Sequence, residues 1–112
     1  MRESYLVNDL IRGLYAVAHL DRINTGTVRT ASGRRFSTGT PRGYSDLSGY
    51  IRGQYSITGT AIPLYLEAKV RPNKPSAEQI KFIDQKRADG AVAGVVYSVD
   101  EAWDLIIPYI KK

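Results

Sequence analysis

The clearest alternation of apolar and polar positions lies at residues 62–70, and it predicts a β-strand bounded by turn residues. Because side chains alternate between the two faces of a strand, one face should pack on the core through Leu64, Leu66, Ala68 and Val70. Glu67 and Lys69 then share the other face with Tyr65, roughly 7 Å apart along the strand. A carboxylate and an amine are costly to bury in such a strand unless they are paired or used. We therefore expect the rest of the chain to supply their partners.

Apolar spacings of three and four predict a helix over residues 3–19, with an inward stripe of Leu6, Leu10, Leu14 and Val17. Glu3 continues this stripe backwards, so its carboxylate should face inwards at the first turn. It either stabilises the positive end of the helix or faces an internal cation. A second helix is predicted from Ser76 to about Asp89, with Gly90 as its stop, and a third from Ser98 until Pro108 kinks or ends it.

Between the helices the pattern predicts short strands and turns over residues 22–42, a strand over residues 46–51 and a short buried strand over residues 93–97. The order is a helix, two or three strands in a meander, the central strand, a helix, a strand and a helix. This order predicts an α/β fold with a small mixed β-sheet flanked by helices. The last two strands should be joined by a parallel crossover through the second helix.

The chain has 112 residues, which suits one domain spanning 1–112 with a modest core. It contains no cysteine, so disulfides, cysteine zinc sites and a cysteine nucleophile are excluded, and His19 alone cannot build a histidine metal site. No apolar run is long enough to span a membrane. Polar residues interrupt the N-terminal segment, which is unlike a signal peptide. We expect a soluble, cytoplasmic protein without a membrane partner.

The net charge of +5 comes from one segment, residues 22–53, which has six arginines and one acid, Asp46. The remaining ten basic and ten acidic residues cancel. An arginine excess among glycine, serine and threonine is typical of phosphate recognition, although a solvated surface is the simpler interpretation. The candidate DNA contacts, including two from the basic connector at residues 71–75, are Arg29, Arg34, Arg35, Arg42, Arg71 and Lys74.

Ser76 and Gln79 have the spacing of a capping box, in which each side chain bonds the backbone of the other. That purely structural interpretation competes with a functional role for Gln79. Asp46 likewise has two interpretations. An aspartate after a glycine-rich turn is usually a turn or cap residue, but its place one hairpin before Glu67 favours a site.

Several motifs together resemble the VRR-NUC nucleases of the PD-(D/E)xK superfamily, which have a restriction-endonuclease-like core. They are Gly43-Tyr44-Ser45-Asp46, Leu66-Glu67-Ala68-Lys69, Ser76-x-x-Gln79, Gly90 and Val95-Val96-Tyr97-Ser98-Val99-Asp100-Glu101. The resemblance spans nearly the whole chain, with Ser45 standing where the family usually has proline. The single-domain form is similar to the phage-type members, which resemble Holliday-junction resolvases.

The resemblance implies a metal-dependent, structure-selective DNA endonuclease that cuts branched DNA such as four-way junctions. Asp46, Glu67 and the backbone carbonyl of Ala68 would bind Mg²⁺ or Mn²⁺, with Glu3 close to the metal. Lys69 would orient or activate the attacking water, and Gln79 would position Lys69 or the phosphate. Capping and catalysis by Gln79 are expected to exclude each other in one conformation.

Two other classes compete with a nuclease. A non-catalytic basic DNA-binding module would explain the arginines but not the inward Glu67 and Lys69. A structural protein would hold that pair as a buried salt bridge of little net value. Two symmetric cuts would require a homodimer. Apolar residues beyond what one core needs would form its interface or stack on bases: Tyr50, Tyr55, Ile57, Tyr65, Trp103, Ile106, Tyr109 and Ile110.

Overall fold

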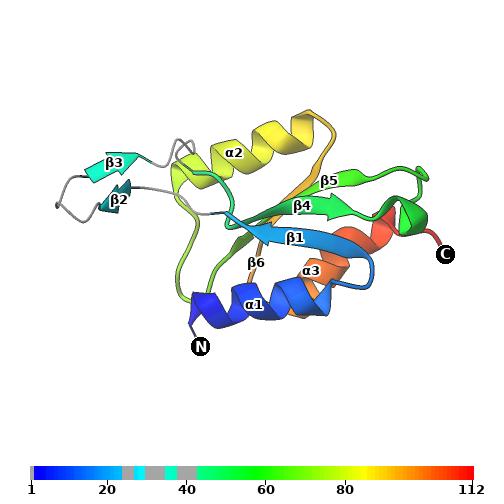
Figure 1. The fold of residues 1–112 in the computed structure, drawn as a ribbon, viewed down its shortest axis with the longest axis horizontal. Helices are drawn as coiled ribbons and strands as arrows, with labels where there is room; N and C mark the ends of the chain where they lie inside the picture. Colours follow the sequence, from blue (N-terminus) through cyan, green and yellow to red (C-terminus); the bar gives the residue numbers. More distant parts are fainter. Residues whose placement is uncertain (1, 24–26, 30–34, 38–42) are drawn as a thin grey trace.

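The computed structural model describes residues 2–23, 27–29, 35–37 and 43–112, and within 27–29 and 35–37 it describes the backbone alone (Figure 1). In chain order the elements are α1 (Glu3–Gly13), β1 (Ala18–Arg22), β2 (Thr27–Arg29), β3 (Arg35–Ser37), β4 (Leu47–Ile51), β5 (Ile62–Ala68), α2 (Ala77–Ala88), β6 (Val92–Val96) and α3 (Val99–Ile106). Two 3₁₀ turns, Gly53–Tyr55 and Ile107–Tyr109, complete the list. None of the described helices is long and apolar enough to cross a membrane.

The main sheet has the strand order β1-β4-β5-β6. β1 pairs with β4 and β4 with β5 in antiparallel fashion, whereas β5 and β6 are parallel and are joined through α2. The predicted mixed α/β fold and the parallel crossover are therefore confirmed. β5, the predicted central strand, lies between β4 and β6, so both of its edges are hydrogen-bonded.

Helices cover the two faces of the sheet unequally. α1 and α3 cover one face, below the sheet in Figure 1, and α2 lies above it. The face towards α1 and α3 holds the larger core, in which Leu64, Leu66 and Ala68 are fully buried. On the other face α2 packs through Phe82 and Ile83. The predicted alternation along β5 is confirmed, because Tyr65 lies against Phe82 on the α2 side.

The first predicted helix was too long. α1 ends at Gly13, and residues 18–22, part of which had been assigned to the helix, form β1. His19 pairs with Tyr50, and Ala18 pairs with Ile51. Leu14 is fully buried in the connecting turn, so it faces the core without being helical. Pairing with β4 makes residues 18–22 a strand, although their apolar spacing also suited a helix.

The main sheet also differs from the predicted meander, because its first strand comes from residues 18–22 rather than 22–42. β2 and β3 instead form a separate antiparallel pair. Other ends are as predicted. α2 begins after Ser76, Gly90 follows it with φ +97°, and α3 ends at Ile106 before Pro108. Of the apolar residues assigned to an interface, Ile106 is fully buried in the core.

Candidate active site

Asp46 and Glu67 meet at one end of the sheet. Leu47 pairs with Leu66, so the residues just beyond, Asp46 and Glu67, stand opposite each other at this end. The backbone amide of Ala68 donates a hydrogen bond to Asp46 Oδ2 at 2.9 Å. The amide of Ile23 donates to the Asp46 carbonyl at 2.7 Å. The Asp46 carboxylate is therefore held against β5 rather than capping a local turn.

Glu67 is the charged side chain at the centre of this arrangement, and it is only 2 % exposed. Its Oε2 accepts a hydrogen bond from Gln79 Nε2 at 3.0 Å and lies 3.6 Å from Lys69 Nζ. Its Oε1 is buried and has no hydrogen-bond partner among the described residues. The pairing of Glu67 and Lys69 predicted from their alternation thus forms, but it satisfies only one carboxylate oxygen.

Burial, together with the neighbouring charge of Asp46, raises the pKa of Glu67 from its usual 4.5 to about 8. The nearness of the Asp46 side chain adds to this rise in the pKa of Glu67, while the charge of Lys69 opposes it. Two carboxylates therefore face one ammonium group. The site lacks positive charge when both carboxylates are ionised.

Gln79 both caps α2 and reaches the candidate site. The side-chain Oε1 of Gln79 accepts a hydrogen bond from the Ser76 backbone amide at 2.8 Å. The backbone amide of Gln79 donates to Ser76 Oγ at 3.1 Å. Its Nε2 is thereby turned towards Glu67 Oε2. Capping and contact with Glu67 do not exclude each other, because the oxygen of the Gln79 side-chain amide makes one bond and its nitrogen makes the other.

Ser76→Ala should therefore lower the stability and loosen the site together. Loss of an N-cap hydroxyl costs about 1 kcal/mol, which corresponds to a fall in Tm of about 4 °C for a domain of this size. The measurement is thermal unfolding followed by circular dichroism. Ser98→Ala is the matched control, because Ser98 Oγ caps α3 through the Glu101 amide and does not contact the site. An unchanged Tm for Ser76→Ala would contradict the contribution of the Ser76 cap to stability.

Glu3 lies apart from the other expected ligands. Its Oε2 accepts a hydrogen bond from Asn73 Nδ2 at 3.5 Å, in the connector between β5 and α2. Within the described part of the chain, no three Asp, Glu, His or Cys side chains lie close enough together to hold one metal ion. The structure therefore brings Asp46, Glu67, Lys69 and Gln79 together and leaves Glu3 at the connector.

A network that the sequence did not indicate anchors the same connector. The Tyr97 hydroxyl donates to the Asn73 carbonyl at 2.9 Å, and the Arg71 guanidinium lies 4.3 Å from the centre of the Tyr97 ring. Arg71 Nη2 also lies 3.3 Å from Glu101 Oε2. Glu101 Oε1 in turn accepts from the Tyr97 amide at 3.1 Å. In the sequence, Ser98 and Glu101 also have the capping-box spacing, which indicates a local cap of the last helix and not this network.

The remaining predicted DNA contacts have different outcomes. Arg34 and Arg42 lie outside the described residues, and Arg29 and Arg35 belong to β2 and β3, where the backbone alone is described. Arg71 and Lys74 are exposed on the connector that follows Lys69. Both therefore lie close in sequence to the candidate site, although Arg71 is already paired with Glu101.

The chemistry of the site suits a hard divalent cation. Asp46 and Glu67 supply carboxylate oxygens, and the backbone of Ala68 lies between them through its bond to Asp46. Mg²⁺ and Mn²⁺ prefer such oxygen ligands. Glu67 Oε1 is buried without a partner in the part of the chain that the structure describes, and Lys69 forms an ion pair with Glu67 through Oε2. The residues present thus fit the expected cation.

No protein-family model matches the chain, and none of the curated proteins does so either. The similarity to VRR-NUC nucleases therefore remains a prediction based on the motifs.

Proposed function

We propose that the protein is a divalent-metal-dependent DNA endonuclease of the VRR-NUC type, with a restriction-endonuclease-like core. One observation carries the proposal. Asp46, just before β4, lies opposite Glu67 on β5, Lys69 pairs with Glu67, and one buried Glu67 oxygen has no partner among the described residues. A structural salt bridge would satisfy its carboxylate, since unpaired buried oxygens are costly.

Asp46, Glu67 and the carbonyl of Ala68 would hold Mg²⁺ or Mn²⁺, which when bound supplies a Lewis acid for the phosphate and lowers the pKa of water. Lys69 is placed to orient the attacking water and to offset negative charge on the phosphate. Gln79 fixes the Glu67 carboxylate, and its bond to Ser76 sets the direction of its amide. The amino end of α2 adds a favourable environment for the phosphate.

The test is cleavage of a labelled panel, comprising linear duplex, flap, splayed arm and four-way junction, with Mg²⁺, Mn²⁺ or a chelator. We expect cleavage with either metal, none with the chelator, and the fastest rate on the four-way junction. Absence of metal-dependent cleavage on every member would contradict the nuclease assignment. Faster cleavage of plain duplex than of the junction would contradict the substrate.

DNA affinity should fall steeply with salt, because phosphate contacts release counterions. Replacing Arg34 and Arg35 together with glutamine should flatten the slope of log affinity against log salt by about two units or slightly less. Fluorescence anisotropy at several salt concentrations measures this slope. The control is the double replacement Lys111→Gln with Lys112→Gln, at the far end of the molecule from the amino end of α2 (Figure 1). An unchanged slope for the arginine variant would place the DNA elsewhere.

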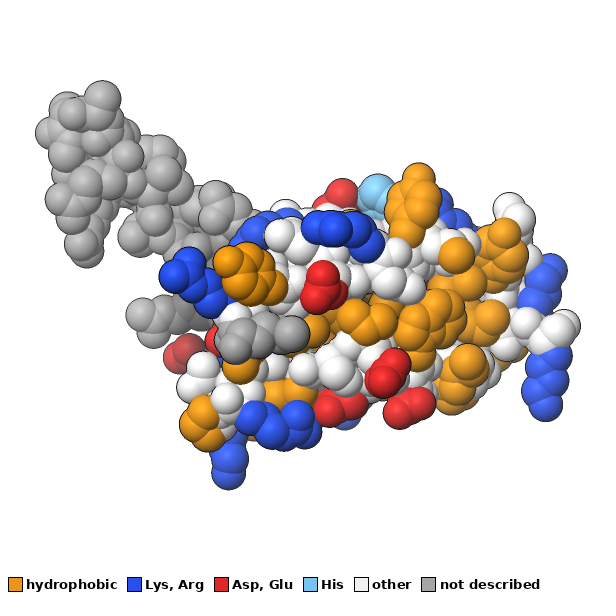
Figure 2. All heavy atoms as spheres, turned by 90° about the horizontal axis from the view of Figure 1, so that it is seen from below, with side chains coloured by type: hydrophobic (Ala, Val, Ile, Leu, Met, Phe, Trp, Pro, Cys, Tyr) orange, Lys and Arg blue, Asp and Glu red, His pale blue; other side chains and the backbone are white. Residues whose placement is uncertain are grey.

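We further propose a homodimer, since a junction with two-fold symmetry needs two matching sites. Apolar side chains gather on the face formed by α1 and α3, shown in Figure 2. Tyr15 and Ile107 are 64 % and 58 % exposed. Exposed apolar patches of this kind favour interfaces. Light scattering at micromolar concentration should give a dimer mass, and a monomer mass both alone and on junction DNA would refute the dimer.

A further inference from the structure

Part of the sheet has no helix over it on the side of the candidate site. α2 packs on β5 and β6 through Phe82, Ile83 and Ala93. Among the described elements, none covers the same side of β1 and β4. Strand register places five side chains on this surface, which we term the open sheet face: His19, Asp21, Ser48, Tyr50 and Pro63. Tyr65, on the same side of the sheet, lies at its border against Phe82 of α2. These side chains form two rows across the strands. The outer row holds His19, Tyr50 and Pro63, and the inner row holds Asp21 and Ser48. Asp46 and Glu67 form a third row beyond the inner one.

Two aromatic rings in the outer row form a stacked pair. His19 and Tyr50 are register partners, with ring centroids 5.3 Å apart and planes 27° apart. Tyr50 is 40 % exposed, and the side chain of His19 is 38 % exposed. Both rings therefore remain accessible to solvent instead of packing in a core. A flat, exposed aromatic surface is what an unpaired base stacks on.

This pair lies along the strand from the candidate site. Tyr50 pairs with Pro63, four residues before Glu67, which corresponds to roughly 13 Å along β5. Bases stacked at about 3.4 Å per nucleotide would cover this distance in about four steps, and fewer if the strand is extended. The open sheet face can therefore carry the same DNA strand whose phosphate lies at Lys69.

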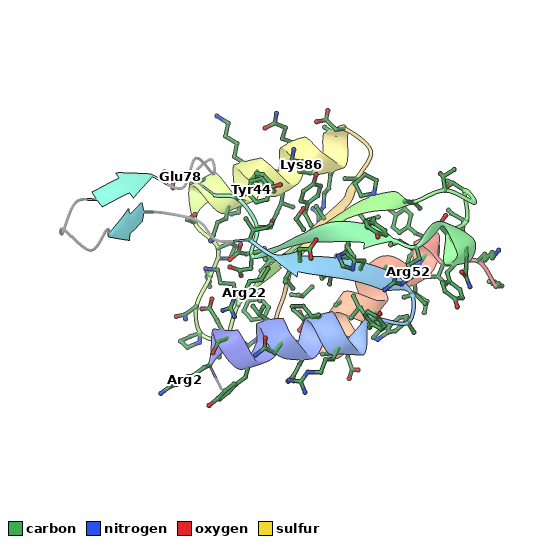
Figure 3. All side chains as sticks on the ribbon, viewed as in Figure 1. Arg2, Arg22, Tyr44, Arg52, Glu78 and Lys86 are labelled. Atoms are coloured by element: carbon green, nitrogen blue, oxygen red, sulfur yellow. The ribbon has the colours of Figure 1, made fainter. Side chains whose placement is uncertain are left out.

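Lys86 borders this path, and Arg52 follows the end of the strand that carries Tyr50. Lys86 Nζ, on α2, lies 5.2 Å from the ring centres of both Tyr65 and Phe82. Arg52 follows Tyr50 by two positions, and its guanidinium lies 4.8 Å from the centre of the Tyr15 ring. Figure 3 shows Lys86 on α2 and Arg52 at the far end of β1. Asp21 is the acid on this face, and His19 Nε2 is 3.1 Å from its Oδ1.

We infer that the open sheet face binds an unpaired segment of the DNA substrate, with a base stacked on the His19–Tyr50 pair. The inference rests on the proposed nuclease function for its choice of ligand. It adds that the enzyme holds single-stranded DNA next to its site, which adds affinity for flap and splayed-arm substrates relative to plain duplex. Duplex DNA presents no free base faces to such a surface, and so it gains nothing from this pair.

The test is binding of a fluorescein-labelled thymidine oligonucleotide of about twelve nucleotides, with a chelator present so that no cleavage occurs. Four full-length proteins are compared: wild type, Tyr50→Thr, Tyr50→Phe and Tyr5→Ala. Threonine keeps a strand-favouring side chain without the ring, and phenylalanine keeps the ring. Tyr5 is a tyrosine that is 60 % exposed on α1, outside the open sheet face, and serves as the control.

Tyr50→Thr should weaken binding of the single strand by about tenfold or more, while Tyr50→Phe and Tyr5→Ala stay within about twofold of wild type. Affinity for plain duplex should be the same in all four proteins. Equal single-strand affinities for wild type and Tyr50→Thr, or equal losses on single strand and duplex, would overturn the inference. The binding assay needs no metal, so a loss of single-strand affinity in Tyr50→Thr would support the stacking surface even if the protein cleaves no DNA. Cleavage without any effect of Tyr50→Thr on single-strand binding would overturn the stacking surface alone.

Discussion

Lys69→Ala is expected to lower the rate of DNA cleavage by about 10³-fold or more while leaving the fold intact. Lys69 Nζ is 3.6 Å from Glu67 Oε2, and its side chain is only 15 % exposed, so its charge acts in a largely water-excluded place. No other described cation forms an ion pair with Glu67. Asp46→Ala should have a comparable effect, because Asp46 is the second carboxylate and is fixed by the Ala68 amide.

Single-turnover rates on a four-way junction with Mn²⁺ provide the measurement, and circular dichroism checks the fold. The matched control is Lys74→Ala, which removes an equal charge from an exposed place on the connector after β5. It should weaken binding and leave the rate at saturating protein within about tenfold of wild type. Metal-dependent turnover near the wild-type rate in Lys69→Ala or Asp46→Ala would refute the assignment of the site.

Glu67→Gln should stabilise the metal-free protein above pH 8 by about 1–3 kcal/mol, even though it should abolish cleavage. The folded-state pKa of Glu67, about 8, lies above the unfolded value of 4.5, so the folded protein binds the extra proton. This contribution to stability is complete below pH 4.5 and is lost as the pH rises through about 8. Wild-type stability should therefore fall between these pH values, and the glutamine variant should lose that part of the fall.

Urea unfolding at about pH 5 and at about pH 8.5, without metal, measures the difference between wild type and variant at each pH. Asp104→Asn, an exposed change on α3, serves as the control for loss of a carboxylate. Added Mn²⁺ should stabilise the wild type at the higher pH and not the Gln variant, because binding to the native state stabilises it. If Glu67→Gln is equally stable or less stable than wild type at the higher pH, the interpretation that the ionised Glu67 carboxylate destabilises the metal-free fold is wrong.

The sequence predicted the centre of the site well because the period of a strand is strict. Leu64, Leu66 and Ala68 on one face left Tyr65, Glu67 and Lys69 on the other, and the structure has this arrangement. Gln79 was also placed correctly, since a capping box fixes where a helix begins. Local rules were enough for these residues, because each depends on neighbours within one element.

Features that depend on contacts between distant segments were predicted less well. The spacing of Leu14 and Val17 suited a helix, but pairing between β1 and β4 ends α1 at Gly13. Glu3 was expected beside the metal, whereas it bonds Asn73, and nothing local indicates that partner. The bonds from Tyr97 to Asn73 and from Arg71 to Glu101 join residues 24 and 30 positions apart.

The most direct test of the metal site is a crystal of the protein soaked with Mn²⁺, with anomalous scattering used to locate the ion. We predict a peak bound by the carboxylates of Asp46 and Glu67 and by the carbonyl of Ala68. Such a peak would show what the unpartnered oxygen of Glu67 is for. A map without manganese at these residues, with Lys69 paired directly to Asp46, would contradict the account.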